Sequence, residues 1–231
     1  MDTAVVTGAS RGVGAAVARR FAAEGVHVVG CSRDGEELDA VVADIAGEGG
    51  AMTGLRADVR DEYDVERLME TAARAGDAGG IDCLVANAAV YHGPEGASPL
   101  SETDYSAFDD TLRVNVRGVF ASIREAVPHL TGGARVLVPS GVVAREATAG
   151  YGAYAVSKAA AEAVARQFAA ELEATVGVID LGRVDTALTD AGEGRDPAEA
   201  AAMTWWAATA AEAGEVDGTV LAVADWRRAR G

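Results

Sequence analysis

The pair Tyr154 and Lys158 is the part of this sequence whose residue types and spacing best predict chemistry. Lys158 is the only lysine in a chain with nineteen arginines. Two residues four apart on a helix lie on one face. An isolated phenol titrates near pH ~10, and a cation ~4–6 Å away lowers that pKa by ~1–3 units. The spacing therefore predicts that Lys158 lowers the pKa of Tyr154, which then serves as proton donor and acceptor.

A glycine cluster near the N-terminus predicts a dinucleotide site. It follows the β-branched run 3–7 (TAVVT) and precedes an alanine-rich helical pattern that continues to Glu24. Gly8 and Gly12 allow backbone conformations in which amide N–H groups and a helix N-terminus face a pyrophosphate, and Gly14 allows close packing of helix on strand. A tight turn without a ligand is the alternative, but the order strand, glycine turn and helix favours the nucleotide.

The end of the second predicted strand, 26–31, bears on which cofactor is bound. A free ribose hydroxyl favours an acidic side chain there, whereas a 2′-phosphate favours arginine and hydroxyl donors. Ser32 stands at this point, Arg33 follows it, and Arg11 lies in the glycine turn. These residues favour NADP(H). Asp34 is the competing signal, because NAD(H) would be favoured if its carboxylate reached the ribose. In a third interpretation, Arg33 and Asp34 are only solvated loop charges.

Strand and helix patterns alternate along the chain, which predicts a parallel sheet with right-handed crossovers. Further strands are expected at 53–57, 81–86, 135–138, 176–181 and 219–223. Helices are expected at 36–47, 63–75, 102–130, 152–173 and 197–213. No repeat, low-complexity tract or linker divides the 231 residues, so we expect a single domain over 1–231.

Three further positions at predicted strand ends or in helices are candidate site residues. Asp58 ends a strand and is suited either to the adenine amine or to an ordinary loop contact. The small residues of 87–89 (NAA) would let a cofactor lie against the backbone, or could form a plain loop. Asn115 lies in an apolar helical stretch and must find hydrogen-bond partners, so it is either structural or holds a water for proton relay.

Composition excludes several classes of partner. The formal charge of −16 repels nucleic acid and anionic membrane surfaces, so neither is an expected partner. Adaptation to high salt is one explanation of the acidic, lysine-poor composition, and a GC-rich genome, which would explain the arginine and alanine bias, is the alternative. Cys31 and Cys83 form neither a metal cage nor a disulfide framework, and are expected on non-adjacent strands about 9.6 Å apart. We expect no metal, no membrane span and no signal peptide, and a cytoplasmic protein.

Together these motifs resemble the short-chain dehydrogenase/reductase family over almost the full chain. The matching residues are Thr7-Gly8-x3-Gly12-x-Gly14, Asp58, Asn87-Ala88-Ala89, Asn115, Tyr154-x3-Lys158 and Gly182-x3-Thr186. The resemblance implies an α/β, three-layer, doubly wound Rossmann fold with a seven-stranded parallel sheet. It also implies a homodimer or homotetramer paired through the helices at 102–130 and 152–173.

The resemblance assigns roles to the site residues. Tyr154 is implied to be the proton donor or acceptor, and Lys158 to lower its pKa and bind the nicotinamide ribose. Asn115 is implied to support a water relay, and Thr186 to contact the carboxamide. The expected catalytic set is Tyr154, Lys158, Asn115 and Ser140. The expected cofactor-binding set is Gly8, Ser10, Arg11, Gly12, Val13, Gly14, Ser32, Arg33, Asp58, Val59, Asn87, Ala88, Ala89, Tyr154, Lys158, Gly182, Val184 and Thr186.

The chain departs from the family pattern at the serine that orients the substrate. That serine normally lies thirteen residues before the tyrosine, where this chain has Gly141. Ser140 is one place early, and it can substitute only if the backbone bulges there, because neighbouring strand residues point in opposite directions. Ala89 and Leu181 replace a family glycine and proline, which are mild changes. The segment between Thr186 and the helix at 197 is short for a substrate lid.

Two functions from different classes fit this pattern. The leading hypothesis is an NADP(H)-dependent oxidoreductase that moves hydride between the nicotinamide and a carbonyl or secondary alcohol carbon of a small molecule, with Tyr154 shuttling the proton. The alternative is a cofactor-binding sensor or scaffold that has lost turnover. Gly141 favours the alternative, whereas the single lysine beside Tyr154 favours the enzyme, because binding alone requires no tuned phenol.

Overall fold

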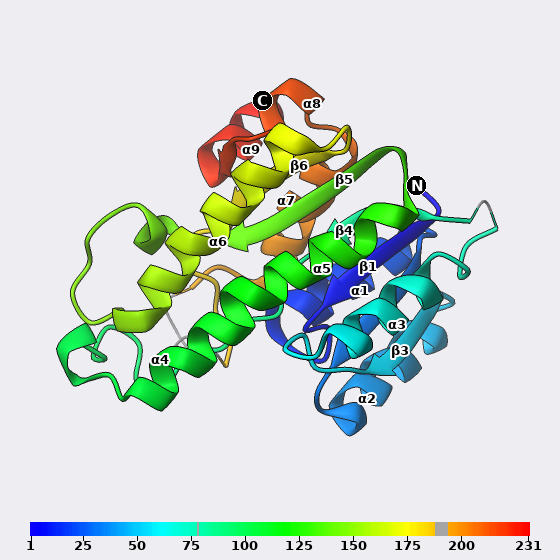
Figure 1. The fold of residues 1–231 in the computed structure, drawn as a ribbon. Helices are drawn as coiled ribbons and strands as arrows, with labels where there is room; N and C mark the ends of the chain where they lie inside the picture. The colour runs from blue at the N-terminus through cyan, green and yellow to red at the C-terminus, as the bar shows by residue number, and fades with distance from the viewer. Residues whose placement is uncertain (78, 188–193) are drawn as a thin grey trace.

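Seven parallel strands form one sheet in the order β3-β2-β1-β4-β5-β6-β7 (Figure 1). The computed structural model describes residues 1–77, 79–187 and 194–231. The strands are β1 (Thr3–Thr7), β2 (His27–Ser32), β3 (Met52–Arg56), β4 (Ile81–Val85), β5 (Leu130–Ser140), β6 (Thr175–Asp180) and β7 (Val220–Ala222). The order reverses between β1 and β4, which leaves a crevice outside the carboxyl ends of these strands. The predicted doubly wound sheet is confirmed.

Helices cover both faces of the sheet and make the outer two of three layers (Figure 1). They are α1 (Gly12–Ala23), α2 (Gly35–Gly47), α3 (Glu62–Ala72), α4 (Tyr105–Leu112), α5 (Gly118–Ala126), α6 (Gly152–Glu171), α7 (Pro197–Thr209), α8 (Ala213–Val216) and α9 (Val223–Ala229). Buried residues of α1, α2 and α7 form one core with the sheet, and those of α3, α5 and α6 form the other.

Alternation along β1 shows how the strands serve both cores. Ala4 and Val6 pack on the side of α1 and α7, whereas Val5 packs on the side of α3 and α5. All three are fully buried, which is why the strand is continuously apolar in sequence. Both faces of β1 are therefore used for packing against helices.

The predicted helix at 102–130 is wrong in its continuity. Short 3-10 turns occupy Leu100–Glu102 and Val127–His129, and a π-helical turn at Arg113–Arg117 separates α4 from α5. Pro128 cannot donate a backbone hydrogen bond, and the chain passes from there into β5, which starts five residues before the predicted strand at 135–138. The helix predicted at 197–213 likewise ends at Thr209, and β7 gives way at Val223 to a helix that was not predicted.

Cys31 and Cys83 lie on β2 and β4, which β1 separates, as predicted. Both are free and buried, and burial raises the pKa of each thiol to about 12. Both are therefore uncharged, unreactive core residues at neutral pH.

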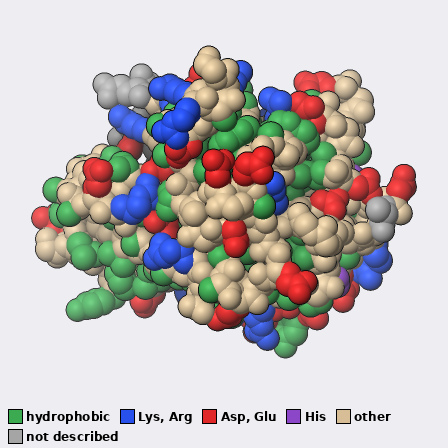
Figure 2. Space-filling model, turned by 90° about the horizontal axis from the view of Figure 1, so that it is seen from above, with side chains coloured by type: hydrophobic (Ala, Val, Ile, Leu, Met, Phe, Trp, Pro, Cys, Tyr) green, Lys and Arg blue, Asp and Glu red, His purple; other side chains and the backbone are tan. Residues whose placement is uncertain are grey.

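Acidic side chains are spread over the face in Figure 2, with basic and apolar ones between them. The negative charge of the chain is therefore not gathered into one patch on this face. Among the residues that the structure describes, no helix combines the length and the apolar character needed to cross a bilayer.

Candidate active site

A pocket of about 670 Å³ opens at the carboxyl edge of the sheet, where strand ends and the start of α6 meet. It has the size of a ligand or cofactor site. The sequence-predicted residues that line it are Gly8, Ser10, Arg11, Gly12, Val13, Gly14, Ser32, Arg33, Asp58, Val59, Asn87, Ala88, Ala89, Ser140, Tyr154, Lys158, Gly182, Val184 and Thr186. Asn115 is the one predicted site residue that is not part of this lining.

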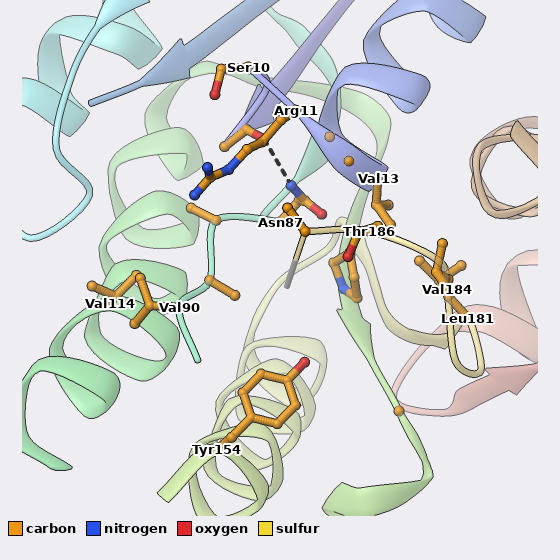
Figure 3. A pocket seen from close by; sticks show the side chains of 18 of the residues that line it. Ser10, Arg11, Val13, Asn87, Val90, Val114, Tyr154, Leu181, Val184 and Thr186 are labelled. Carbon is orange, nitrogen blue, oxygen red and sulfur yellow. Dashed lines mark hydrogen bonds between the residues drawn. The ribbon is translucent and has the colours of Figure 1, made fainter. Parts of the chain in front are cut away.

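The glycine turn has the close backbone packing that its sequence predicts. Gly8 has a φ of 68°, and a Cβ on Gly14 would lie 2.1 Å from the Gly8 carbonyl oxygen. The amide of Asn87 donates to the carbonyls of Thr7 (2.9 Å) and Gly8 (3.3 Å), which ties the turn to the end of β4 (Figure 3). Arg11, at the N-cap of α1, makes no side-chain capping bond, so the first amides of the helix are left for a ligand.

The segment after β6 lies against the glycine turn. A Cβ on Gly12 would approach the Thr186 methyl group to 3.2 Å, and Asp180 accepts a hydrogen bond of 2.9 Å from the Gly182 amide. Thr186 and Val184 therefore face the same pocket as Asn87 (Figure 3). The short lid expected between Thr186 and Pro197 falls largely on residues 188–193, outside the described part of the chain.

At the other end of the pocket, the Asp34 carboxylate is used locally. Its Oδ1 accepts a 3.1 Å hydrogen bond from the Glu37 amide and so caps α2. Asp34, the residue that favoured NAD(H) in the sequence, therefore has a structural role as the cap of α2. Arg33 lines the pocket and is exposed, and its guanidinium forms no hydrogen bond or ion pair with any described residue.

Asp58 is held by Arg60 beside the pocket. Arg60 Nε donates to Asp58 Oδ1 (3.0 Å) and Nη2 to Oδ2 (2.6 Å), and Nη1 reaches Asp110 (2.6 Å). Burial acts to raise the pKa of the Asp58 carboxyl, but the bonds from Arg60 outweigh burial and the pKa is lowered. The carboxylate keeps acceptor positions for a ligand, and Arg60 fixes its direction.

Tyr154 and Lys158 lie on α6 and close together, as predicted. The Lys158 Nζ atom is 5.6 Å from the centroid of the Tyr154 ring, and the phenol extends from the helix into the pocket, across from Asn87 and Thr186 (Figure 3). The predicted lowering of the Tyr154 pKa is wrong for this structure. Burial raises the pKa, and the nearby Glu95 carboxylate and two further tyrosines raise it more. The phenol is therefore protonated at neutral pH.

Lys158 is buried, and its ammonium donates a hydrogen bond to the backbone rather than to the Tyr154 hydroxyl. Nζ donates a 3.0 Å hydrogen bond to the carbonyl of Pro139, at the end of β5. Burial lowers the pKa of Lys158 to about 8, and Glu162, one helical turn further along α6, partly opposes this. The sole lysine of the chain is thus close to its titration point under physiological conditions.

Asn115 has a structural role in the π-helical turn. Its side chain donates to the Val90 carbonyl (2.9 Å) and to Ser157 Oγ (2.9 Å), and accepts from the Val90 amide (2.8 Å). Both amide hydrogens are used. Asn115 therefore fixes the segment after β4 against α6, and any water relay would have to use its main-chain carbonyl or a remaining acceptor lone pair.

The bulge that would let Ser140 replace the family serine is absent. β5 pairs with β6 in unbroken register from Arg135 to Ser140. Ser140 Oγ donates instead to the buried carboxylate of Glu162 (2.7 Å). The structure therefore contradicts the expected substrate-orienting role of Ser140, although the residue borders the pocket.

Arg145 joins Glu162 to Asp180 and so anchors the segment that follows β5. It donates to both carboxylates, which are buried, and is itself about one-third exposed. Gly141 lies in that segment with a φ of −156°, which any residue adopts, and a Cβ placed there would meet no atom within 4 Å. The position therefore has room for a side chain.

The wall near Tyr154 contains residues that the sequence did not single out. Tyr91 packs on Tyr154 with centroids 4.9 Å apart. Glu95, whose side chain is 8% exposed, accepts from the Tyr151 hydroxyl (3.1 Å) and from Arg183 Nη2 (3.0 Å). These two hydrogen bonds join Glu95 to residues 56 and 88 positions further along the chain.

A parallel doubly wound sheet with a glycine turn, an uncapped helix N-terminus and a tyrosine–lysine pair in one pocket defines a Rossmann-type dinucleotide-binding domain. A family model described as short chain dehydrogenase matches residues 2–195. The chain belongs to the short-chain dehydrogenase/reductase family.

Curated relatives agree with this membership. The chain is 38% identical over 171 residues to dehydrogenase/reductase SDR family member 4 of Homo sapiens, which is 73% of this chain and 60% of that protein. It is 38% identical over 189 residues to 1-deoxy-11-beta-hydroxypentalenate dehydrogenase of Streptomyces exfoliatus, which is 79% and 67% of the two chains. The match with the human protein thus spans about 60% of that relative's length.

Solved structures are similar over nearly the whole chain. A dehydrogenase/reductase from Sinorhizobium meliloti superposes with a TM-score of 0.86 at 32% identity and covers 96% of this chain and 93% of its own. A short-chain dehydrogenase from Burkholderia cenocepacia in complex with NADP gives 0.85 at 31% identity and covers 96% of both chains.

Proposed function

We propose that this protein is an NADP(H)-dependent oxidoreductase that transfers hydride between the nicotinamide and a carbonyl or secondary alcohol carbon. The observation that carries the proposal is the Tyr154 phenol, which extends into the same pocket as the glycine turn and lies beside the only lysine. A bound nicotinamide supplies the hydride chemistry. The residues of this chain bind and orient the cofactor, and Tyr154 gives or takes the proton at the substrate oxygen.

The Tyr154 hydroxyl serves the two directions of hydride transfer in different protonation states. A Tyr154 hydroxyl whose pKa is raised is protonated at neutral pH and is ready to donate to a developing alkoxide. Alcohol oxidation instead requires the phenolate, which is rare at neutral pH under these conditions.

The preference for NADP(H) is supported by Arg33, whose exposed guanidinium lines the pocket and is not held by any described residue. The Burkholderia cenocepacia neighbour is in complex with NADP, and another from Thermococcus sibiricus is complexed with 5-hydroxy-NADP. Arginine is well suited to a phosphate because its planar group donates two hydrogen bonds at once.

Replacing Arg33 with alanine is expected to weaken NADPH binding by ~10-fold or more and NADH binding by less than ~2-fold, because a hydrogen bond to a charged group contributes ~1.5–3 kcal/mol. The measurement is a titration of each reduced cofactor by fluorescence or calorimetry at one salt concentration. An equal loss for both cofactors would mean that Arg33 does not meet a 2′-phosphate, and the assignment of NADP(H) would fall.

Replacing Gly141 with serine is expected to raise kcat for carbonyl reduction by ~10-fold or more. The new side chain has room, and its hydroxyl would reach the pocket where a developing alkoxide forms; one such donor is worth ~10²–10³ in kcat in a well-preorganised site. Steady-state kinetics of wild type, Gly141→Ser and Gly141→Ala separate the hydroxyl from the added bulk. No gain in the serine variant would indicate that another group already serves the substrate oxygen.

The alternative function is a cofactor-binding sensor or scaffold, and Gly141 is the residue that favours it. A panel of ketones, aldehydes and quinones mixed with protein and NADPH separates the two functions through the near-ultraviolet absorbance of the reduced nicotinamide. We expect saturable oxidation of NADPH with at least one class of carbonyl. Tight NADPH binding without oxidation across the whole panel would support the sensor instead.

We also propose a cytoplasmic single-domain protein that forms a homodimer or homotetramer. The support is on α5 and α6, where Phe120 and Phe168 pack with centroids 5.9 Å apart and Phe120 is 42% exposed. An aromatic pair that is only partly covered is typical of a protein interface. Light scattering on a Phe120→Glu variant tests this, because a lone charge at the centre of such an interface should yield monomers.

A further inference from the structure

The first turn of α2 sends a carboxylate into the end of the pocket where Ser32 and Arg33 lie. Glu37 lines the pocket, and its Oε2 atom accepts a 3.1 Å hydrogen bond from Ser10 Oγ. Its Oε1 atom lies 3.9 Å from Arg11 Nη1. Glu37 thus contacts two donors of the glycine turn that the sequence assigned to the cofactor.

The hydroxyls near Glu37 form a directed chain. Ser32 Oγ donates to Ser10 Oγ over 3.0 Å, and Ser10 in turn donates to Glu37. Ser32 also accepts from the Asp34 amide at 3.2 Å. A hydroxyl has one hydrogen, so neither serine has a hydrogen left to give while this chain is intact. The donors suited to a 2′-phosphate are therefore held by an internal anion.

A 2′-phosphate and the Glu37 carboxylate compete for these groups. A phosphate monoester carries ~−1.5 to −2 charges near neutral pH, so it would be repelled by Glu37 and would have to displace it from Ser10 and Arg11. The 2′-hydroxyl of NADH brings no charge and can itself donate to a carboxylate. The same side chain therefore disfavours one cofactor and tolerates or assists the other.

We propose that Glu37 is a cofactor-selecting residue. Its carboxylate engages Ser10 and Arg11, which are donors suited to a 2′-phosphate, and so lowers the ratio of NADPH affinity to NADH affinity. The proposal rests on the proposed function, because it concerns the same dinucleotide site. The charge of Glu37 opposes that of Arg33. The ratio of the NADPH and NADH affinities therefore depends on one cation and one anion on neighbouring segments. Such a protein would use both cofactors more evenly than Arg33 alone predicts.

A purely structural role for Glu37 has little support. Its side chain is 44% exposed and that of Arg11 is 68% exposed, and an exposed pair at 3.9 Å contributes little to stability. Asp34 already caps α2 through the Glu37 backbone amide, which a side-chain substitution leaves in place. Removing the carboxylate charge should therefore leave the fold unchanged.

The test compares Glu37→Gln with Glu36→Gln in direct binding titrations of NADPH, NADH, 2′,5′-ADP and 5′-AMP. Glutamine keeps the shape and an acceptor oxygen for Ser10 but removes the charge. Glu36 is the matched control, because it is exposed, precedes Glu37 on the same helix turn and is not among the residues that line the pocket. Binding is measured without substrate, so no turnover is needed.

Glu37→Gln is expected to tighten NADPH and 2′,5′-ADP by about tenfold and to change NADH and 5′-AMP by less than about twofold. The gain should shrink as salt is raised, since exposed charges are screened over ~8–10 Å. An unchanged or weaker NADPH affinity in Glu37→Gln would overturn the inference, as would an equal gain in Glu36→Gln. If wild type bound neither dinucleotide, the proposed function itself would fall along with it.

Discussion

Replacing Tyr154 with phenylalanine is expected to lower kcat/KM for carbonyl reduction by ~10³-fold or more, while the Kd for NADPH changes by less than ~3-fold. The phenol extends from α6 into the pocket beside the sole lysine. Among the described residues its hydroxyl forms no hydrogen bond, so the substitution leaves no polar group without its partner. Phenylalanine also keeps the ring packing on Tyr91.

Tyr151→Phe is the matched control for this prediction, because it makes the same chemical change in the same pocket. The Tyr151 hydroxyl is bonded to Glu95, and its loss should cost less than ~10-fold in kcat/KM. The measurements are steady-state kinetics and NADPH titrations on all three proteins. Similar losses in both variants would show that the pocket tolerates neither change and that Tyr154 has no special role in proton transfer.

Replacing Lys158 with methionine is expected to lower kcat/KM by ~10²-fold or more while leaving the protein at least as stable at pH 7 as the wild type. The ammonium is buried, with the Pro139 carbonyl as its hydrogen-bond partner, and burial lowers its pKa to about 8 from 10.5. Holding the charged form inside the protein therefore costs free energy of folding on the order of 3 kcal/mol. Methionine has a similar length and no charge, and removes that cost.

The sign of the pH dependence follows from the same shift. Between pH 8 and pH 10.5 the unfolded chain holds a proton on Lys158 that the folded chain has lost, so the stability of the wild type rises with pH in this window. Below pH 8 both states are protonated and the full cost is present. Chemical denaturation of wild type and Lys158→Met at pH 7 and near pH 10 measures this, and the advantage of the variant should shrink at the higher pH.

Parallel curves for the two proteins across this range would contradict a titrating buried lysine. Activity provides a second readout, because deprotonation of Lys158 should lower cofactor affinity above pH 8 in the wild type but not in the variant. A wild-type Kd for NADPH that stays constant from pH 7 to pH 9.5 would show that the ammonium does not bind the nicotinamide ribose.

The fold was predictable because its local signals agree with one another. The β-branched run at 3–7, the glycine turn and the helix that follows belong to one crossover, and the same alternation continues through Asp180. The prediction was wrong at 102–130, where Pro128 and a π-helical turn divide a pattern that reads as continuously amphipathic. The spacing of apolar residues shows which side chains face the core. It does not show where a π-helical turn places one extra residue in the helix.

The residues of the pocket were predictable from the sequence only where one local motif contains them. Glu37, Glu95 and Arg183 were not singled out, because each acts through partners that are distant in sequence. The Ser140 role depended on the local strand geometry, which only the register of β5 on β6 shows. The pKa of Tyr154 was predicted with the wrong sign, because burial and the Glu95 carboxylate raise it.

The most direct test follows deuterium from NADPH labelled at nicotinamide C4 into the product of a carbonyl substrate found in the panel. Mass spectrometry of the wild-type reaction should find one deuterium on the former carbonyl carbon, and Tyr154→Phe, loaded with the same cofactor, should form almost no labelled alcohol in the same time. Saturable NADPH binding with no labelled alcohol from the wild type, or equal labelling by both proteins, would contradict a hydride transfer completed by the Tyr154 proton.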